Sequence, residues 1–309
     1  LKPLLLSSQT HHFSSIIMNL FTNLFGVLLY SSLLQFSLAS VVSTGYFNQD
    51  FNVIWSPSHV NSSSDGRTVS LKLDEQSGSG IGSKQKFLFG KFDMNMKLVP
   101  GYSAGTVVAF YMTSNQDKRD ELDFEFLGNV LNEPFTLQTN VFVDGFDDRE
   151  ERIHLWFDPT KKFHNYSILW NIYQIVFMVD EIPIRVYRNH ADKGVPYPRR
   201  QPMEVEATIW NGEGWATHGG QAKIDWSKAP FVTSLGNYTI DACVWNGNPR
   251  VCRASSSANW WNQNNYSSLT SSQRRWFKWV RLHHLNYDYC QDIARFHGNL
   301  PKECSLSKY

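Results

Sequence analysis

The chain has 309 residues, and its 29 Lys and Arg against 28 Asp and Glu give a net charge of +1 at pH 7. A chain so close to neutral gives no reason to expect nucleic acid or a strongly anionic substrate as a partner, so a neutral polymer suits it better. Aromatic residues make up 15% of the sequence, including 11 Trp. That share fits either a large core or a cleft in which the flat faces of sugar rings stack on aromatic rings.

An apolar segment near the beginning of the sequence predicts secretion. The first Met is Met18, and residues 20–38 are largely apolar, carry no charge and end at Ser37-Leu38-Ala39, a small-x-small cleavage pattern. We therefore predict an upstream segment and a secretory signal peptide over residues 1–40. The alternative is a membrane anchor, because the run is nearly long enough to span a bilayer. Small and polar residues crowd its second half, so we expect a secreted protein without stable membrane association.

Residues 41–240 contain many short runs in which apolar and polar residues alternate, separated by Gly, Pro, Asn and Ser. Many short strands with turn signals between them predict a β-sandwich or barrel. No long segment here keeps a 3.6-residue period, and there is no Gly-rich phosphate loop. The predicted strands are residues 68–73, 91–98, 106–112, 166–170, 175–179 and 204–209.

Residues 119–128, with the sequence RDELDFEFLG, carry an unusual acidic pattern. Alternate side chains share a face in a strand, so Glu121, Asp123 and Glu125 should point one way and the apolar residues between them should enter a core. Three carboxylates on one face repel one another, a cost that folding alone does not explain. A solvated strand face is the alternative, but such a face normally mixes in Lys, Thr or Ser.

Paired carboxyl groups predict glycoside hydrolysis. Retention of configuration needs two carboxyl groups roughly 5–5.5 Å apart, and inversion needs a wider gap. Glu121 and Glu125 should lie roughly 13 Å apart at Cα, and two long Glu side chains leaning inward can close most of that distance. Asp123 between them should keep one Glu ionised and help to move the proton of the other.

Trp210 and Trp215 are candidates for a sugar-binding surface. In residues 204–210, Trp210 shares a strand face with the polar Glu206 and Thr208, whereas the apolar residues share the opposite face. Core packing is the alternative for both tryptophans. The polar company of Trp210 favours a cleft.

The four Cys predict disulfides in a secreted protein. Cys243 and Cys252 lie nine residues apart, and Cys290 and Cys304 lie fourteen apart. Three pairings are possible, of which two short sequential loops are the simplest. A metal site is the alternative, but there is no C-x-x-C pair, so we expect no metal. Sequons for N-glycosylation, which agree with a secretory route, occur at Asn61, Asn165, Asn237 and Asn265.

The end of the chain differs from the strand-rich part. Residues 271–289 predict one helix packed on the sandwich, with either Ser271 or Ser272 as its cap. A tail pinned by cysteines should follow it. The residues at helical spacing are Trp276, Trp279, Val280 and His283.

These features together resemble the plant xyloglucan endotransglucosylase/hydrolases of glycoside hydrolase family 16. Residues 120–128 match the D-E-[IL]-D-F-E-F-L-G signature of that family, and the resemblance covers roughly residues 45–304. The other matching segments are FLFGK at 87–91, KLVPG at 97–101, SAGTV at 103–107, LWFDPT at 155–160, GVPYP at 194–198, WAT at 215–217, DWSKAPF at 225–231 and the four-Cys tail with LPKEC at 300–304.

The resemblance implies an all-β fold, a concanavalin A-like β-jelly-roll sandwich with a cleft on its concave face, a short C-terminal helix and a disulfide-pinned extension. We accordingly expect a catalytic jelly roll over residues 41–240 and an extension over residues 241–309. By position it implies Glu121 as the nucleophile, Glu125 as the general acid/base and Asp123 as an assisting residue. Substrate contacts are implied, with the last three on the acceptor side, for Tyr111, Gln138, Asn140, Arg152, Trp210, Trp215 and Arg295.

The sequence departs from the family pattern in three places. Asn129-Val130-Leu131 is not a sequon, although many members carry one just after the catalytic strand. Arg119 stands where His is usual, and Glu213-Gly214 replaces a more common acidic pair before Trp215. We expect the last two departures to affect acceptor preference more than the chemistry.

The implied function is that of a retaining xyloglucan endotransglucosylase in the cell wall, or apoplast, with xyloglucan donor and acceptor chains as partners and no cofactor. The aromatic residues on the acceptor side favour transfer to a sugar over hydrolysis. The alternatives are a xyloglucan endohydrolase, an enzyme that accepts cellulose or mixed-linkage glucan, and a non-catalytic protein that only binds wall polysaccharide.

Overall fold

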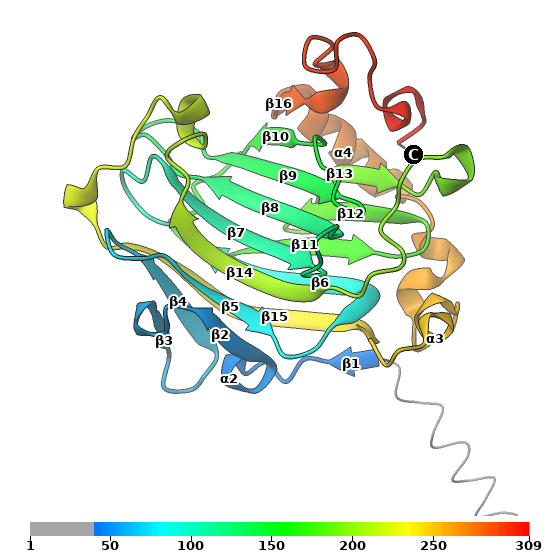
Figure 1. Cartoon of the computed structure of the whole chain (residues 1–309), viewed down its shortest axis with the longest axis horizontal. Coiled ribbons are helices and arrows are strands. Elements are labelled where there is room, and N and C mark those ends of the chain that lie inside the picture. The colour runs from blue at the N-terminus through cyan, green and yellow to red at the C-terminus, as the bar shows by residue number, and fades with distance from the viewer. Residues whose placement is uncertain (1–39, 309) are drawn as a thin grey trace, which may run out of the picture. The chain divides into compact units, whose positions relative to one another are not determined.

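The computed structural model describes residues 40–308, so the predicted secretory segment lies outside the described residues except for Ser40. Two antiparallel sheets of eight strands pack face to face (Figure 1). The front sheet has the order β16 (Leu285–Asp288), β10 (Glu151–His154), β9 (Thr136–Phe142), β8 (Glu121–Leu127), β7 (Thr106–Thr113), β14 (Glu204–Asn211), β5 (Ser79–Ser83) and β2 (Phe51–Trp55). The back sheet has the order β13 (Ile182–Arg188), β12 (Gln174–Val179), β11 (His164–Trp170), β6 (Phe87–Lys97), β15 (Phe231–Val244), β4 (Thr68–Leu73) and β3 (Val60–Ser62), with β1 (Ser40–Val42) paired to β15.

Helical segments are few and short. The α-helices are α2 (Phe47–Asp50), α3 (Pro249–Arg253) and α4 (Ser271–His283). Single 3₁₀ turns occur at Pro57–His59, Ala191–Lys193, Thr217–Gly220, Trp226–Lys228, Trp260–Asn262, Asn264–Tyr266, Tyr289–Gln291 and Lys302–Ser305. The six strands predicted from alternation correspond to β4, β6, β7, β11, β12 and β14. The prediction of an all-β sandwich is therefore confirmed.

Strand β8 has one apolar face and one acidic face, as the alternation of apolar and acidic residues in its sequence predicts. Leu122, Phe124 and Phe126 are all 2% exposed or less and point at the back sheet. The Phe124 ring lies 5.2 Å from Phe177 of β12, and the Phe126 ring lies 4.6 Å from Tyr166 of β11, both in edge-on contact. Burying each such ring contributes roughly 1.5–3 kcal/mol, so the apolar face anchors the strand and turns the acidic face outward.

A buried arginine joins the two sheets near β9. Arg185 of β13 is 1% exposed, and its guanidinium donates to the carbonyl oxygens of Thr139 (2.8 Å) and Arg149 (2.5 Å). A charge in a core is tolerated only when its donors are satisfied, as they are here by backbone carbonyls. The contact fixes the middle of β9 and the segment that leads into β10.

The C-terminal helix was predicted correctly in place but not in extent. Helix α4 ends at His283, and the residues after it form β16, which pairs with β10. Its N-cap is Thr270, not Ser271 or Ser272: the Thr270 hydroxyl accepts from the backbone of Gln273, whose side chain accepts in return from the Thr270 backbone. This is a capping box, which satisfies two backbone donors at once.

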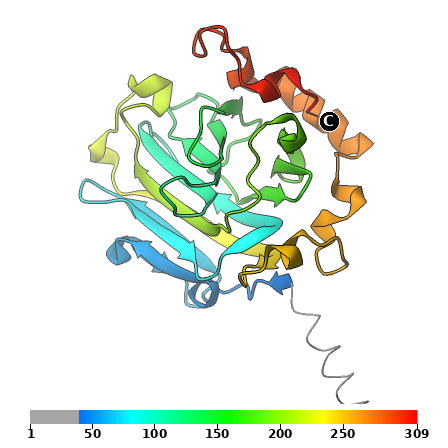
Figure 2. The ribbon, with the colours of Figure 1, turned by 45° about the vertical axis from the view of Figure 1, so that its right-hand side comes forward.

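Both predicted disulfides are present, Cys243–Cys252 and Cys290–Cys304. The extension runs along the side of the sandwich from α3 to the end of the chain (Figure 2). The second disulfide closes the tail, and Glu303 within it forms a 2.7 Å ion pair with Arg149 in which both side chains are less than 10% exposed.

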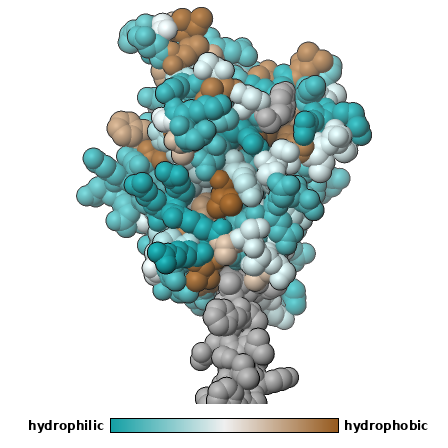
Figure 3. Space-filling model, turned by 90° about the vertical axis from the view of Figure 1, so that its right-hand side faces the viewer, coloured by the Kyte–Doolittle hydropathy of each residue, from teal (hydrophilic) through white to brown (hydrophobic). Residues whose placement is uncertain are grey.

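The face that carries this extension is mixed in character. In Figure 3, apolar side chains appear as separate spots on a mostly hydrophilic surface. Within residues 40–308, no helix is long and apolar enough to cross a membrane.

Candidate active site

The three carboxylates of β8 lie on the outer face of the front sheet. The register places Glu121, Asp123 and Glu125 opposite residues of β7 on one side and of β9 on the other. The β7 partners, in that order, are Thr113, Tyr111 and Ala109, and the β9 partners are Phe142, Asn140 and Gln138. Side chains that oppose one another across a sheet share a face, so the strands just before and just after β8 in the sequence bring their polar groups to the acidic strand.

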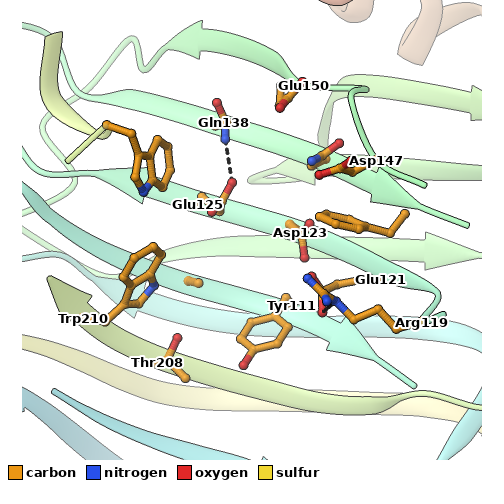
Figure 4. A pocket seen from close by; sticks show the side chains of 14 residues that line it. Tyr111, Arg119, Glu121, Asp123, Glu125, Gln138, Asp147, Glu150, Thr208 and Trp210 are labelled. Carbon is orange, nitrogen blue, oxygen red and sulfur yellow. Dashed lines mark hydrogen bonds and ion pairs between the residues drawn. The ribbon is translucent and has the colours of Figure 1, made fainter. Parts of the chain in front are cut away.

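All of these residues except Thr113 line a cleft of about 440 Å³ (Figure 4). Its lining contains the three carboxylates and five of the seven side chains for which the family resemblance implied a substrate contact. Those five are Tyr111, Gln138, Asn140, Trp210 and Trp215, and the remaining lining residues are Ala109, Arg119, Phe142, Asp147, Glu150 and Thr208.

The Glu125 carboxylate is hydrogen-bonded to the side-chain amide of Gln138, which is hydrogen-bonded in turn to the guanidinium of Arg152. Gln138 donates from Nε2 to Glu125 Oε2 (2.6 Å) and accepts at Oε1 from Arg152 Nε (2.6 Å). Burial raises the pKa of Glu125, the Gln138 hydrogen bond opposes that rise, and the neighbouring Glu121 and Glu150 add to it. The net effect is a raised pKa, which suits a group that must hold a proton to give away.

Asp123 lies between the other two carboxylates and is 5% exposed. Burial raises its pKa well above the ordinary value, and the charges of Glu121 and Glu125 raise it further. The pKa values of all three carboxyl groups are raised, so their neighbouring charges favour protonation of a member of the cluster. Asp123 is the member whose environment most favours the protonated form.

Glu121 has a cation as its partner. Arg119 Nε donates to Glu121 Oε2 at 2.8 Å, and the guanidinium lies over the ring of Phe142 at 4.7 Å. Burial raises the pKa of Glu121, and Arg119 opposes the rise through both its hydrogen bond and its charge. Arg119 therefore contacts the nucleophile candidate directly, and its effect on acceptor preference stays a prediction.

Tyr111, which lines the cleft, is hydrogen-bonded to a further carboxylate, that of Glu206. Its hydroxyl donates to Glu206 Oε2 (2.6 Å), and Asn115 donates to the other Glu206 oxygen (3.1 Å). Burial and the charge of Glu206 raise the pKa of Tyr111, so the phenol remains a donor. Sequence reasoning placed Glu206 on the face of Trp210 but gave it no role, since its pairing with Tyr111 joins residues 95 positions apart.

Trp210 and Trp215 form one wall of the cleft, with ring centroids 6.0 Å apart and planes 40° apart. The prediction of a cleft position over core packing is confirmed for both. Flat apolar rings beside carboxylates are typical of a surface for a sugar chain.

Arg152 and Arg295 lie at the edge of the cleft and do not line it. Arg152 supports Gln138, lies over the ring of Tyr287 at 5.2 Å and lines an adjoining hollow of about 300 Å³. Arg295 donates to Glu150 (2.7 Å) and to Tyr287 (3.1 Å), and it also pairs with Asp148. Both side chains therefore act on the cleft through neighbours, and a direct substrate contact of either stays a prediction.

The described part of the chain groups no three His, Cys, Asp or Glu side chains in an arrangement that could hold a metal ion. The chemistry that the cleft offers is proton transfer and nucleophilic attack by carboxylates.

Two family models match the chain. Residues 47–228 match the model described as glycosyl hydrolases family 16, and residues 255–304 match the one described as xyloglucan endo-transglycosylase (XET) C-terminus. The chain is 65% identical over 290 residues to the probable xyloglucan endotransglucosylase/hydrolase protein 10 of Arabidopsis thaliana, covering 94% of this chain and 97% of the relative. It is 48% identical over 262 residues to the xyloglucan endotransglucosylase protein 34 of Populus tremula x Populus tremuloides, covering 85% and 88%.

Solved structures share the fold at lower identity. The apo Crh5 transglycosylase aligns with a TM-score of 0.55 and 21% identity, covering 72% of this chain and 91% of that one. A laminarinase from Flavobacterium sp. UMI-01 aligns with a TM-score of 0.53 and 16% identity, covering 66% and 99%. These likenesses show the two-sheet jelly roll.

Proposed function

Because the chain belongs to glycosyl hydrolase family 16, among the plant xyloglucan endotransglucosylase/hydrolases, we propose that it cuts the β-1,4-glucan backbone of xyloglucan and joins the fragment to another xyloglucan chain. One observation carries the proposal. Three carboxylates share the floor of a cleft, with a cation on Glu121 and an amide donor on Glu125. Both partners favour the carboxylate form, but a cation does so more strongly than a neutral amide, so Glu121 suits a nucleophile, which needs its charge, and Glu125 an acid, which needs its proton.

In the first step, the Glu121 carboxylate attacks the anomeric carbon of a backbone glucose. The glycosidic C–O bond breaks, and Glu125 gives its proton to the departing oxygen. The products are a glycosyl ester on Glu121 and a Glu125 carboxylate. Arg119 favours the ionised form of Glu121 before the attack, and a protonated Asp123 adds no second negative charge beside it.

In the second step, the Glu125 carboxylate takes the proton of an incoming 4-hydroxyl, whose oxygen attacks the anomeric carbon. The ester bond breaks, and Glu121 leaves as a carboxylate. The product is a new glycosidic bond, with configuration retained after two inversions. Water in place of the sugar hydroxyl would give hydrolysis.

Transfer over hydrolysis depends on how well the acceptor is held. A bound hydroxyl outcompetes water through proximity and orientation, which are worth several powers of ten in rate. The wall formed by Trp210 and Trp215 offers stacking area for sugar rings. The Arg152 guanidinium is hydrogen-bonded to Gln138, which in turn contacts Glu125, and it adds a fixed polar group at the edge of the cleft. These features support a transferase.

We place this activity outside the cell, in the plant cell wall. Two disulfides favour an oxidising compartment, and the four sequons agree with passage through the secretory route. Neutral wall glucans also suit the net charge of +1.

The test uses purified secreted protein with high-molar-mass xyloglucan and a fluorescent xyloglucan oligosaccharide. Polymer size, label in the polymer and new reducing ends are followed together. Glu121→Ala is the inactive variant, and Glu75→Ala, at an exposed acid outside the cleft, is its matched control. We expect the wild type and the control to move label into the polymer with few new reducing ends. Glu121→Ala should bind the glucan but neither move label into the polymer nor change its size.

Other outcomes would change the conclusion. Shorter polymer with many new ends and little label would show a hydrolase. Transfer of label into cellulose or mixed-linkage glucan at a comparable rate would change the substrate. Equal behaviour of Glu121→Ala and the wild type would leave a protein that only binds wall polysaccharide.

A further inference from the structure

Another hollow, of about 290 Å³, lies on the outer face of the back sheet, away from the carboxylates. Its floor is made by Leu169 of β11 together with Val176 and Met178 of β12. Leu169 and Val176 are register partners, on the face opposite to Phe177, which points at the front sheet. Trp260, Tyr266 and residues 268–270 form the wall, so the C-terminal extension turns a strand surface into a groove. We refer to it as the back groove.

The aromatic wall of the back groove is fixed in place. Trp260 donates from its ring nitrogen to Asp241 (2.7 Å), and the Tyr266 ring packs against it with centroids 4.6 Å apart. The carbonyl of Tyr266 accepts from the side chains of Asn171 (3.0 Å) and Gln174 (3.0 Å). A rigid aromatic wall beside an apolar floor is a suitable support for a pyranose ring, because little side-chain entropy is lost when the ring binds.

The rim of the back groove offers polar groups. Lys91 and Glu181, which form a 2.7 Å ion pair, line the groove, and so does Gln273 of α4. A few polar groups around an apolar floor are the usual composition of a site for a small polar ligand. Sugar hydroxyls and an acetamido group both fit such a rim.

Asn265 also lines the back groove, and it begins the sequon Asn265-Tyr266-Ser267. Its side chain is exposed and makes no hydrogen bond to any described residue. Asn165 differs, because its amide donates to Asn95 (3.1 Å) and its oxygen accepts from Ser167 (2.6 Å). The sequons at Asn61 and Asn237 are exposed but line none of the described hollows.

We propose that Asn265 carries an N-linked glycan whose first sugar turns back onto Trp260 and Tyr266 and fills the back groove. The covalent bond to Asn265 keeps the sugar at high effective concentration, so even a weak contact is largely occupied. The same contact covers apolar surface that would otherwise face water. The glycan then joins the extension to the back sheet and stabilises their contact.

The experiment uses the full secreted protein, produced in yeast so that its glycans can be trimmed by endoglycosidase H to one N-acetylglucosamine. Glycopeptide mass spectrometry gives the occupancy of each sequon. Thermal unfolding and hydrogen exchange compare the intact, trimmed, Asn265→Gln and Asn237→Gln proteins. Asn237→Gln is the matched control, since it removes an exposed sequon away from the groove.

We expect occupancy at Asn265 and little change in melting temperature on trimming to one sugar. Asn265→Gln should lower the melting temperature by roughly 2–4 °C and speed hydrogen exchange in peptides covering residues 260–270, and Asn237→Gln should do neither. Transglycosylation should be unchanged in both variants. An unmodified Asn265, or equal melting and exchange in the two variants, overturns the proposal. So does protection of residues 260–270 in Asn265→Gln by added xyloglucan oligosaccharide, because the groove would then be a site for free glucan.

Discussion

The ion pair between Arg119 and Glu121 gives the sharpest prediction about the chemistry. Replacing Arg119 by Gln removes the cation but keeps a polar side chain of similar length. The protonated form of Glu121 is then favoured, because burial continues to raise its pKa and the opposing charge is gone. Since the nucleophile must be ionised, the acid limb of the pH profile of kcat/KM should move to higher pH.

The size of the shift follows from the geometry. The contact is 2.8 Å long, and the two side chains are 43% and 13% exposed. Two unit charges about 4 Å apart interact by ~1 kcal/mol in water and ~4 kcal/mol near a protein surface. The Arg119 side chain is more than a third exposed, so we use the lower part of that range, ~1.5 kcal/mol, which corresponds to about one pKa unit.

The assay is kcat/KM for transfer to a labelled oligosaccharide between pH 4 and 8, for wild type, Arg119→Gln and Arg119→Lys. Because the carboxyl groups titrate together, the acid limb reports one apparent pKa of the cluster, and the whole limb should shift along the pH axis. We expect it to rise by about one unit in Arg119→Gln and by less in Arg119→Lys, which keeps the charge. An unmoved limb with an equal loss of rate at every pH would refute the reasoning, and would mean that Arg119 contacts the substrate instead.

Three further predictions concern the supports of the cleft. Gln138→Leu removes the donor that lowers the pKa of the acid/base carboxylate, so the alkaline limb of kcat/KM should move to higher pH; an unchanged limb would contradict this. Glu303→Ala leaves Arg149 buried without its partner and should cost ~3 kcal/mol in urea unfolding, whereas Lys302→Ala, at an exposed neighbour, should cost little. Glu151 has its pKa lowered to about 2, because its cationic partners outweigh its burial. A lowered folded-state pKa stabilises the fold above the unfolded value of 4.5, so roughly 3 kcal/mol of unfolding free energy should be lost as pH falls from about 4.5 to 2. Glu151→Gln should remove that part of the pH dependence, and an unchanged acid titration of stability would show that other groups cause it.

The acidic face of β8 could be predicted from sequence because side-chain direction in a strand is local. Alternation alone places Glu121, Asp123 and Glu125 together, whatever the neighbouring strands are. The sandwich also followed from local patterns, since many short alternating runs admit few other folds. The same holds for Trp210, whose polar neighbours on one face predicted its place in the cleft.

The partners of these residues could not be predicted in the same way. Glu206 reaches Tyr111 only because β14 pairs with β7 in one register, and a shift of one residue would turn Glu206 inward. The direction of Arg119 depends on the turn that precedes β8. The end of α4 was misplaced because pairing of β16 with β10 overrides a local preference for helix.

The C-terminal extension also acts on the cleft, although it touches none of the three carboxylates. Its disulfide-closed tail brings Glu303 to Arg149, whose backbone N–H donates to the side-chain oxygen of Asn140 (3.3 Å). Asn140 lines the cleft directly opposite Asp123 on the neighbouring strand. Transfer needs the acceptor hydroxyl in a near-attack position, and an error of about 1 Å can cost a factor of a hundred, whereas water needs no such wall. A cleft that selects sugar over water therefore needs its β9 side held rigid, and in this chain Glu303, from the last tenth of the sequence, supports that side through Arg149.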